Sequence, residues 1–186
     1  MKRTILRYGF IGGFIVAPEL IATTVYTKST GHEFEHGMVI GYASMILAFS
    51  FIFVALKHLR DKQYGGIISF GKAFKAALLI TLVTATFYVV TWLVCYYFFI
   101  PDFMEKYTAY TLNAAKEQGL SADEIAKQTE QLKQYSDMYK NPLFVVLLTY
   151  MEILPVGLLV SLIASLIIKR KTAAPQPGKA YASGAA

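Results

Sequence analysis

Four long runs of apolar residues dominate the chain and predict helices that span a membrane. They cover about residues 8–27, 37–56, 76–100 and 142–168, and their only charged residues are Glu19 and Glu152. About 20 apolar residues in helical conformation cross a bilayer. In hydrocarbon, each backbone polar group must find a partner inside its own segment, so the runs are expected to be helical. The pattern therefore predicts an all-α membrane protein with four transmembrane helices, occupying residues 1–171.

Residues 101–141, between the third and fourth runs, are more polar and show two amphipathic patterns at helical spacing. Gly119 is a plausible end for the first helix, and Ser121 with Glu124 matches a capping box that starts the second. Asn141-Pro142 then marks the start of the fourth span. We therefore expect a helical hairpin outside the membrane, between the third and fourth spans.

Between the second and third spans, residues 57–75 are basic. Phe70 and Phe74 fall four residues apart and two lysines fall three apart, which is typical of a short helix lying in the headgroup layer. A simple loop whose lysines mark the cytoplasmic side accounts for the pattern equally well. Residues 172–186 are rich in Pro, Gly and Ala and predict a disordered cytoplasmic tail.

The distribution of charge predicts the orientation. Twelve of the 18 Lys and Arg residues lie before the first span, at 57–75 or after the fourth span, where Asp61 is the only acid. The opposite side carries six basic residues against nine acids. By the positive-inside rule, both termini are cytoplasmic and the hairpin is extracytoplasmic.

Composition supports the membrane class and excludes several others. Only 16% of residues are charged and 55% are hydrophobic, whereas soluble domains carry about 25% charged residues. The single cysteine, Cys95, excludes a disulfide scaffold. The net charge of +6 does not indicate nucleic-acid binding, because the basic residues gather at the ends of apolar segments. The lipid bilayer is the expected partner.

Each predicted span carries a stripe of small or polar residues, such as Gly37, Gly41, Ser44 and Ala48 in the second span. Such stripes let helices approach closely and let hydroxyls bond between them, although a transport pathway would show the same pattern. The small-xxx-small pairs are Gly9 with Gly13 and Gly37 with Gly41.

Glu19 and Glu152 are the strongest candidates for chemistry. They are predicted to lie about 12 and 15 Å below the outer surface, at a depth where no span has a Lys or Arg. A charge at mid-membrane costs at least ~2.5 kcal/mol, so a protonated or proton-sharing pair is the natural hypothesis. A protonated acid that only bonds a carbonyl left free by Pro18 or Pro155, or a threonine hydroxyl, is the structural alternative. The candidate polar site comprises Glu19, Glu152, Thr23, Tyr88 and Thr149.

The string HEFEH at residues 32–36 matches short zinc-enzyme motifs. Two histidines, His32 and His36, are separated by one helical turn, and Glu33 has the position of a general base. The string lies in a short loop without a nearby third ligand, so a solvated histidine pair is the alternative. No other cofactor is expected.

Four segments of the chain have distinctive wording: MVIGYASMILAFSFIFVALKHLRD, GGIISFGKAFKAALLITL, DFMEKYTAYTL and YKNPLFVVLLTYMEILPVGLLVSLIASLIIKRK. In this order they resemble a known family, the bacterial inner-membrane domain-of-unknown-function family 4199, found mainly in the Bacteroidetes group. The resemblance covers nearly all of residues 1–171. It implies four spans with an outer segment between the third and fourth, and a bacterial inner membrane, but it implies no activity, substrate or catalytic residue.

Three functions are compatible with these patterns. The first is a non-enzymatic interaction or accessory bundle that binds a membrane-protein partner or another copy of itself. The second is a small proton-linked transporter or channel that uses Glu152 and Glu19. The third is a zinc enzyme at His32, Glu33 and His36, facing the periplasm.

Overall fold

The structure is a computed structural model that describes residues 1–30 and 37–170. Its elements are α1 (Lys2–Thr30), α2 (Gly37–His58), the π-helix η1 (Leu59–Gln63), α3 (Phe70–Val94), the π-helix η2 (Cys95–Phe99), α4 (Phe103–Glu117), α5 (Ala122–Tyr139) and α6 (Pro142–Ile168). The described residues contain no strand, only an isolated bridge between Ile68 and Arg170. The expected tail at 172–186 lies outside the described residues.

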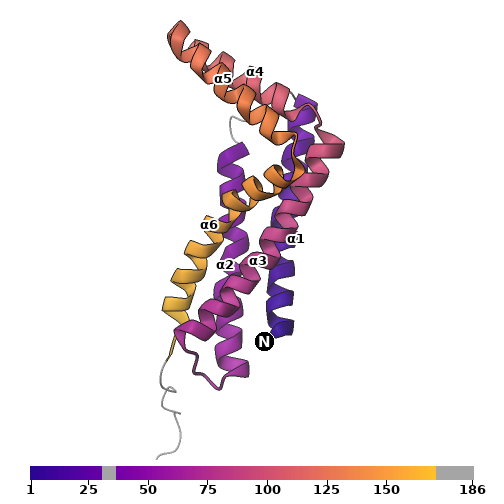
Figure 1. The fold of residues 1–186 in the computed structure, drawn as a ribbon. Helices are drawn as coiled ribbons and strands as arrows, with labels where there is room; N and C mark the ends of the chain where they lie inside the picture. The colour runs from indigo at the N-terminus through magenta and orange to yellow at the C-terminus, as the bar shows by residue number, and fades with distance from the viewer. Residues whose placement is uncertain (31–36, 171–186) are drawn as a thin grey trace, which may run out of the picture.

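The helices α1, α2, α3 and α6 form the membrane bundle (Figure 1). These four described helices are long and apolar enough to cross a membrane. Helices α2 and α3 each pack against both α1 and α6. The predicted all-α fold, with four spans and a helical hairpin between the third and fourth, is confirmed.

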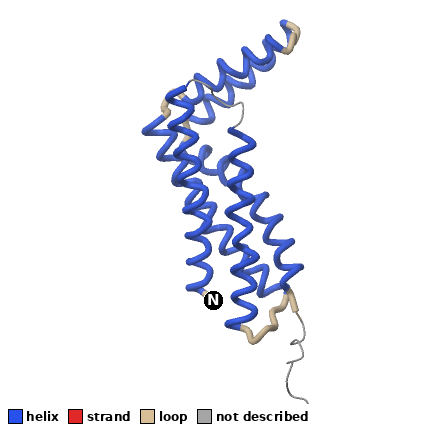
Figure 2. The backbone as a smooth tube through the Cα atoms, turned by 180° about the vertical axis from the view of Figure 1, so that it is seen from behind, coloured by secondary structure: helices blue, strands red, loops and turns tan. Residues whose placement is uncertain are grey.

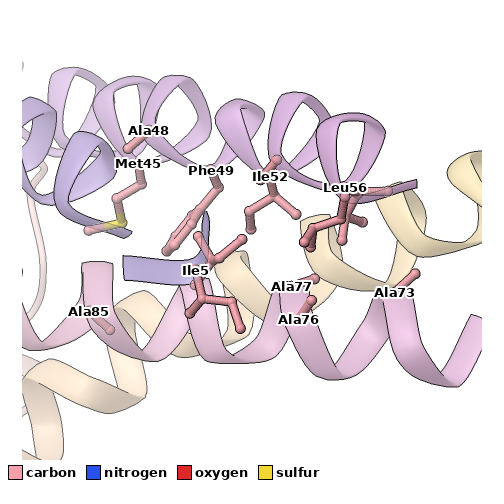
Figure 3. Close-up of a cluster of buried hydrophobic side chains, with 14 of the residues drawn as sticks. Ile5, Met45, Ala48, Phe49, Ile52, Leu56, Ala73, Ala76, Ala77 and Ala85 are labelled. Atoms are coloured by element: carbon pink, nitrogen blue, oxygen red, sulfur yellow. The ribbon is translucent and has the colours of Figure 1, made fainter. Parts of the chain in front are cut away.

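Large side chains of α2 face small side chains of α3 in the bundle core (Figure 3). Met45, Phe49 and Ile52 are completely buried. The facing stretch of α3 presents mainly alanines, including Ala76 and Ala77, which are also completely buried. This large-to-small complementarity brings the helices close enough for dispersion contacts, which help to hold helices together where lipid removes the hydrophobic driving force.

The chain reverses between α2 and α3 in a shorter turn than expected. Helix α2 continues through η1 to Gln63, and Gly65 and Gly66 then adopt positive φ angles of 60° and 86°. Only glycine adopts such angles at little cost, so this pair makes the tight reversal possible. Phe70 and Phe74 lie in the first turns of α3, where their rings stack 5.6 Å apart. The short helical stretch expected at Phe70 and Phe74 is thus the start of α3, and its position in the headgroup layer stays a prediction.

The helices α4 and α5 form the hairpin, which lies obliquely across one end of the bundle and extends beyond it (Figures 1 and 2). The predicted capping box is present: the Glu124 backbone N–H donates to the Ser121 hydroxyl, and Glu124 accepts from the Ser121 backbone. Gly119 has a φ of 74° and ends the preceding helix, as predicted. We call this end of the bundle the hairpin end.

The N-terminus, the α2–α3 turn and the end of α6 meet at the opposite end of the bundle (Figure 1). The Met1 ammonium donates to the Gln63 side chain at 2.5 Å, and the backbones of Ile68 and Arg170 pair. We call this the basic end, because the described residues here include ten Lys and Arg. Its position in the cytoplasm remains a prediction.

Candidate functional site: a carboxyl cluster in the membrane bundle

Glu19 on α1 is held by two hydroxyls. The Thr23 hydroxyl donates to Glu19 Oε1 at 2.9 Å, and Ser44 Oγ on α2 lies 3.1 Å from Glu19 Oε2. Ser44 Oγ also lies 2.8 Å from the Gly41 carbonyl oxygen. Because Ser44 has one hydrogen and two acceptors, it can donate to an ionised Glu19, or donate to Gly41 and accept from a protonated Glu19. The site suits either protonation state of Glu19.

Glu152 on α6 lies next to Tyr88 on α3. The Tyr88 hydroxyl donates to Glu152 Oε1 at 3.5 Å, a long hydrogen bond. The Tyr88 side chain is only 6% exposed, so few other partners can reach its hydroxyl. Tyr88 therefore presents its hydroxyl to the carboxyl of the neighbouring span.

Tyr88 lies near both acids. The charges of Glu152 and Glu19 both act on its hydroxyl, and Glu152 alone lies within hydrogen-bond distance. The two acids come from α1 and α6, which lie diagonally across the bundle, and α3 carries Tyr88 between them. The polar side chains of the four spans form two hydrogen-bonded groups, Glu19 with Thr23 and Ser44, and Glu152 with Tyr88. We call these five residues together the carboxyl cluster.

No basic side chain neutralises this cluster within the described part of the chain. The ion pairs found among those residues, such as Arg60 with Asp61, involve neither Glu19 nor Glu152. A buried charge without a partner is costly in a membrane. Among the described residues, hydroxyl groups, rather than cations, are therefore the partners of both acids.

The cluster lies between the surface of the bundle and its closed core. Glu152 is exposed and Glu19 partly exposed at the surface of the bundle, whereas Phe49 is completely buried. Toward the basic end, Gly157 packs against Phe49 and Thr81. In this conformation, the side chains between the cluster and the basic end form a closed core.

The hairpin reaches toward the cluster through Tyr139, at the end of α5. Its ring lies among aromatic rings of the spans, with centroids 5.6 Å from Tyr96 and 6.0 Å from Phe144. Burial, together with the nearby Glu152 carboxyl, raises the pKa of Tyr139 to about 12. The hairpin base is thus electrostatically coupled to the carboxyl cluster.

Comparison with known proteins places this arrangement in a family. The family described as "Protein of unknown function (DUF4199)" matches residues 7–170, which include the bundle, the hairpin and the carboxyl cluster. The chain belongs to the DUF4199 family. Searches of the curated proteins and of the solved structures found no match. Together with the four apolar helices, this membership describes an integral, multi-pass membrane protein of a family without an assigned activity.

In this DUF4199 member, the other predicted polar residue, Thr149, is not in hydrogen-bond contact with the acids. Its hydroxyl is buried and donates to the Val145 carbonyl of its own helix at 2.7 Å. Ser44 has the role of a polar partner instead. The sequence placed Ser44 in a polar stripe, but the stripe alone does not reveal which hydroxyl faces a carboxyl on another helix.

Two of the predicted glycines lie at close helix contacts. A β-carbon at Gly9 would overlap Val83, and one at Gly13 would overlap Phe87, both on α3. Gly41 has no atom within 4 Å of that position, so it makes no such contact. The surroundings of Gly37 are outside what the structure describes. Gly12 and Gly157, which the small-xxx-small pattern missed, make contacts as close as the first two.

Hydroxyls bond between the helices in the closed part of the core. Thr84 on α3 donates to the Gly9 carbonyl of α1 at 3.2 Å, and Thr81 Oγ1 lies 2.9 Å from Ser161 Oγ on α6. All three hydroxyls are buried. These hydrogen bonds join α3 to α1 and to α6. They also satisfy polar groups whose burial without a partner would cost free energy in lipid.

The predicted zinc motif, His32, Glu33 and His36, lies outside the described residues. Within residues 1–30 and 37–170, no three His, Cys, Asp or Glu side chains gather closely enough to hold a metal ion. The zinc hypothesis therefore stays a prediction from sequence. Cys95, at 1% exposure, is packed inside the bundle.

Proposed function

We propose that this protein is a small proton-linked transporter or channel of the bacterial inner membrane, in which Glu19 and Glu152 take up and release protons. The observation that carries the proposal is a pair of intramembrane carboxyls that, among the described residues, have hydroxyl partners and no cation: Glu19 with Thr23 and Ser44, and Glu152 with Tyr88. Ionisable groups inside a membrane are expensive, and proton relays are a principal reason to keep them.

In this proposal Glu152, which lies near Tyr139 at the base of the hairpin, is the first acceptor for a proton that arrives from the hairpin end. The Tyr88 hydroxyl can then accept one proton while donating another, as a relay between two carboxyls requires. Glu19 can hold the proton because Ser44 switches between donating to it and accepting from it.

Release toward the basic end requires the helices to repack, because the core below the cluster is closed. Pro18 lies inside α1 next to Glu19, and Pro155 lies inside α6 three residues beyond Glu152. Each proline removes one helical hydrogen bond and weakens its helix against bending. The two helices that carry the acids are therefore the ones best able to bend beside them. Because four spans enclose little volume, the working unit in this proposal is a homo-oligomer.

A proton-flux measurement in proteoliposomes tests the proposal. An imposed potential should drive acidification of vesicles that contain the parent protein, followed with a trapped pH-sensitive dye. Glu152→Gln and Glu19→Gln should each slow the flux by about tenfold or more, because the amide cannot exchange the proton. Tyr88→Phe should slow the flux without removing either acid.

Tyr150→Phe is the matched control for the tyrosine variant. The Tyr150 hydroxyl bonds Thr86 at 2.9 Å and has no contact with the carboxyl cluster, so its loss should leave the flux at the parent level. A Glu152→Gln protein that conducts protons as fast as the parent would overturn the proposal.

An interaction role is a second candidate, and the shape of the hairpin favours it. Helices α4 and α5 extend past the bundle (Figure 2), and most of their surface is exposed. In this view the hairpin binds another membrane protein, and no catalytic turnover is involved. Photo-crosslinking residues placed at the exposed positions Lys127 and Lys133 should form a discrete adduct in cells. If neither position yields an adduct, this candidate loses its support.

A further inference from the structure

Two apolar hollows lie one beyond the other on the face where α1 packs against α3. The hairpin-end hollow, of about 780 Å³, follows α1 from Phe14 to Tyr26. The basic-end hollow, of about 370 Å³, follows α1 from Lys2 to Leu6 and is completed by residues of α3 between Leu79 and Thr86. Neither hollow includes a residue of the carboxyl cluster, so the two form a separate feature of the molecule.

Three phenylalanines separate the hollows. Phe87 of α3 lies between Phe10 and Phe14 of α1, with ring centroids 5.1 and 6.1 Å away. Phe10 and Phe14 also project outward, at 43% and 69% exposure. The rings therefore form a ridge across the face. Phe14 and Phe87 line the end of the hairpin-end hollow, and the basic-end hollow lies on the other side of the ridge.

The spacing of these features matches one bilayer. The candidate span of α1 runs from Lys2 to Tyr26, 25 residues, or about 37 Å against a hydrocarbon core of about 30 Å. Its ends consequently lie at the two headgroup layers, and Phe14, at its midpoint, lies near the bilayer centre. From Phe14 to Tyr26 is about 18 Å, close to the thickness of one leaflet. The hairpin-end hollow thus runs from one headgroup layer to mid-membrane, and the basic-end hollow begins at the other headgroup layer.

Along each hollow, a polar side chain at the mouth is followed by apolar side chains, just as the headgroup of a phospholipid is followed by its acyl chains. The interior of the basic-end hollow is lined by aliphatic side chains such as Ile5 and Leu82, and Lys2 lies at its mouth. An ammonium at that depth can pair with a lipid phosphate, while the aliphatic lining takes an acyl chain. At the hairpin-end mouth, Tyr26 provides an aromatic ring with a polar tip, as is common at the membrane interface.

We propose that the α1–α3 face binds two phospholipids, one from each leaflet, with an acyl chain in each hollow and the basic-end headgroup held by Lys2. A helix from a second copy of the chain could pack closely on this face only if the face offered one continuous, unobstructed surface along its length. The ridge of Phe10 and Phe14 interrupts that surface, whereas two acyl chains that end at mid-membrane are compatible with the ridge. The proposal is independent of proton transport.

Native mass spectrometry of the whole protein, released from detergent after addition of palmitoyl-oleoyl phosphatidylglycerol, tests the proposal. The parent should retain up to two phospholipids per chain. Ala22→Phe, which fills the hairpin-end hollow, and Leu82→Trp, which fills the basic-end hollow, should each retain one fewer, and the double variant none. Lys2→Gln should reduce the retained lipid at the basic end only.

The matched control is Ala43→Phe, which adds the same ring at an exposed position of α2. It should retain lipid as the parent does. Ala17→Leu fills the hairpin-end hollow with a smaller side chain. This variant replaces Ala22→Phe in the experiment if the Ala22→Phe protein is not monodisperse. Retention of two lipids by the filled variants would overturn the proposal. If the filled variants changed their oligomeric mass while their lipid retention stayed the same, the proposal would also be overturned. That result would identify a second copy of the chain as the occupant of this face.

Discussion

Glycine 157 illustrates, at the scale of a single residue, how closely the spans approach. A β-carbon there would overlap Thr81 on α3 and the ring of Phe49 on α2, both buried inside the bundle. Small residues at such crossings let helix backbones come together in lipid, where packing is the main source of stability. Gly41 has the same chemistry, but nothing lies near its missing β-carbon.

Replacing these two glycines should therefore have opposite effects. Gly157→Ala should destabilise the protein by about 1–3 kcal/mol, because Thr81 and Phe49 must move. Gly41→Ala should be neutral, or stabilising by up to about 1 kcal/mol, because alanine is the better helix former. Unfolding followed by circular dichroism, as SDS is titrated into mixed micelles, measures both. Equal losses of stability in the two variants would contradict this account of the packing.

Residue identity alone did not specify the carboxyl cluster. The absence of charges elsewhere in the spans was enough to select Glu19 and Glu152. The candidate polar site also included Thr23 and Tyr88, but it included Thr149 in place of Ser44. Thr23 follows Glu19 by one helical turn, so its contact with Glu19 is local. Ser44 and Tyr88 come from other helices, and their contacts depend on how those helices rotate about their axes.

At the scale of the element, the start of α5 is the clearest case of structure encoded locally. Ser121 and Glu124 satisfy each other's backbone N–H groups, which the first turn of a helix would otherwise leave without acceptors. The same exchange needs no other part of the molecule. This is why four residues of sequence were sufficient to predict it.

Removing the cap should loosen the hairpin tip. We expect Ser121→Ala to cost about 1 kcal/mol of local helix stability, seen as faster hydrogen exchange in the first turn of α5. Ser136→Ala, farther along the same helix, is the control and should not accelerate exchange there. Unchanged protection in Ser121→Ala would show that the cap adds nothing to the hairpin.

The same cap should make the hairpin tip sensitive to acid. Hydrogen bonds from the hydroxyl and backbone N–H of Ser121 hold the pKa of Glu124 below its usual 4.5. Since the folded pKa is lower than the unfolded one, this contribution is fully present above the unfolded pKa and is lost as the pH falls through the folded pKa. Protection factors in the first turn of α5 should fall between about pH 6 and about pH 3. In Glu124→Gln, that dependence should disappear.

At the scale of the whole molecule, the two ends of the bundle differ in charge. The basic end carries ten Lys and Arg among the described residues, with Asp61 as its acid, and this acid pairs with Arg60 at 2.7 Å. The hairpin carries several acids and lies at the other end (Figure 1). Because the chain has four spans, its N-terminus and the end of α6 lie on the same side of the bundle. The orientation of the bundle in the membrane therefore determines the side on which both lie.

Labelling of introduced cysteines measures that orientation. Lys127→Cys on α5 should react with a membrane-impermeant maleimide in spheroplasts, whereas Lys62→Cys in η1 should react only after the membrane is permeabilised. The native Cys95 is buried in the bundle, so the parent should give little background. Reaction of both introduced cysteines from the same side would contradict the four-span topology.

The sequence by itself determined the fold class, the helical segments, the hairpin and its cap, because each depends on local composition, periodicity or neighbouring residues. In lipid the secondary structure follows even more directly from the sequence, because each apolar run must satisfy its backbone hydrogen bonds by forming a helix. Only the tertiary structure decided which faces of those helices meet. That choice placed Tyr88 between two acids, brought Ser44 to Glu19, made Gly157 rather than Gly41 a close contact, and left two hollows on the α1–α3 face. Spans that are apolar on nearly every side carry little periodic signal for their rotation, so packing between side chains of distant segments determines it.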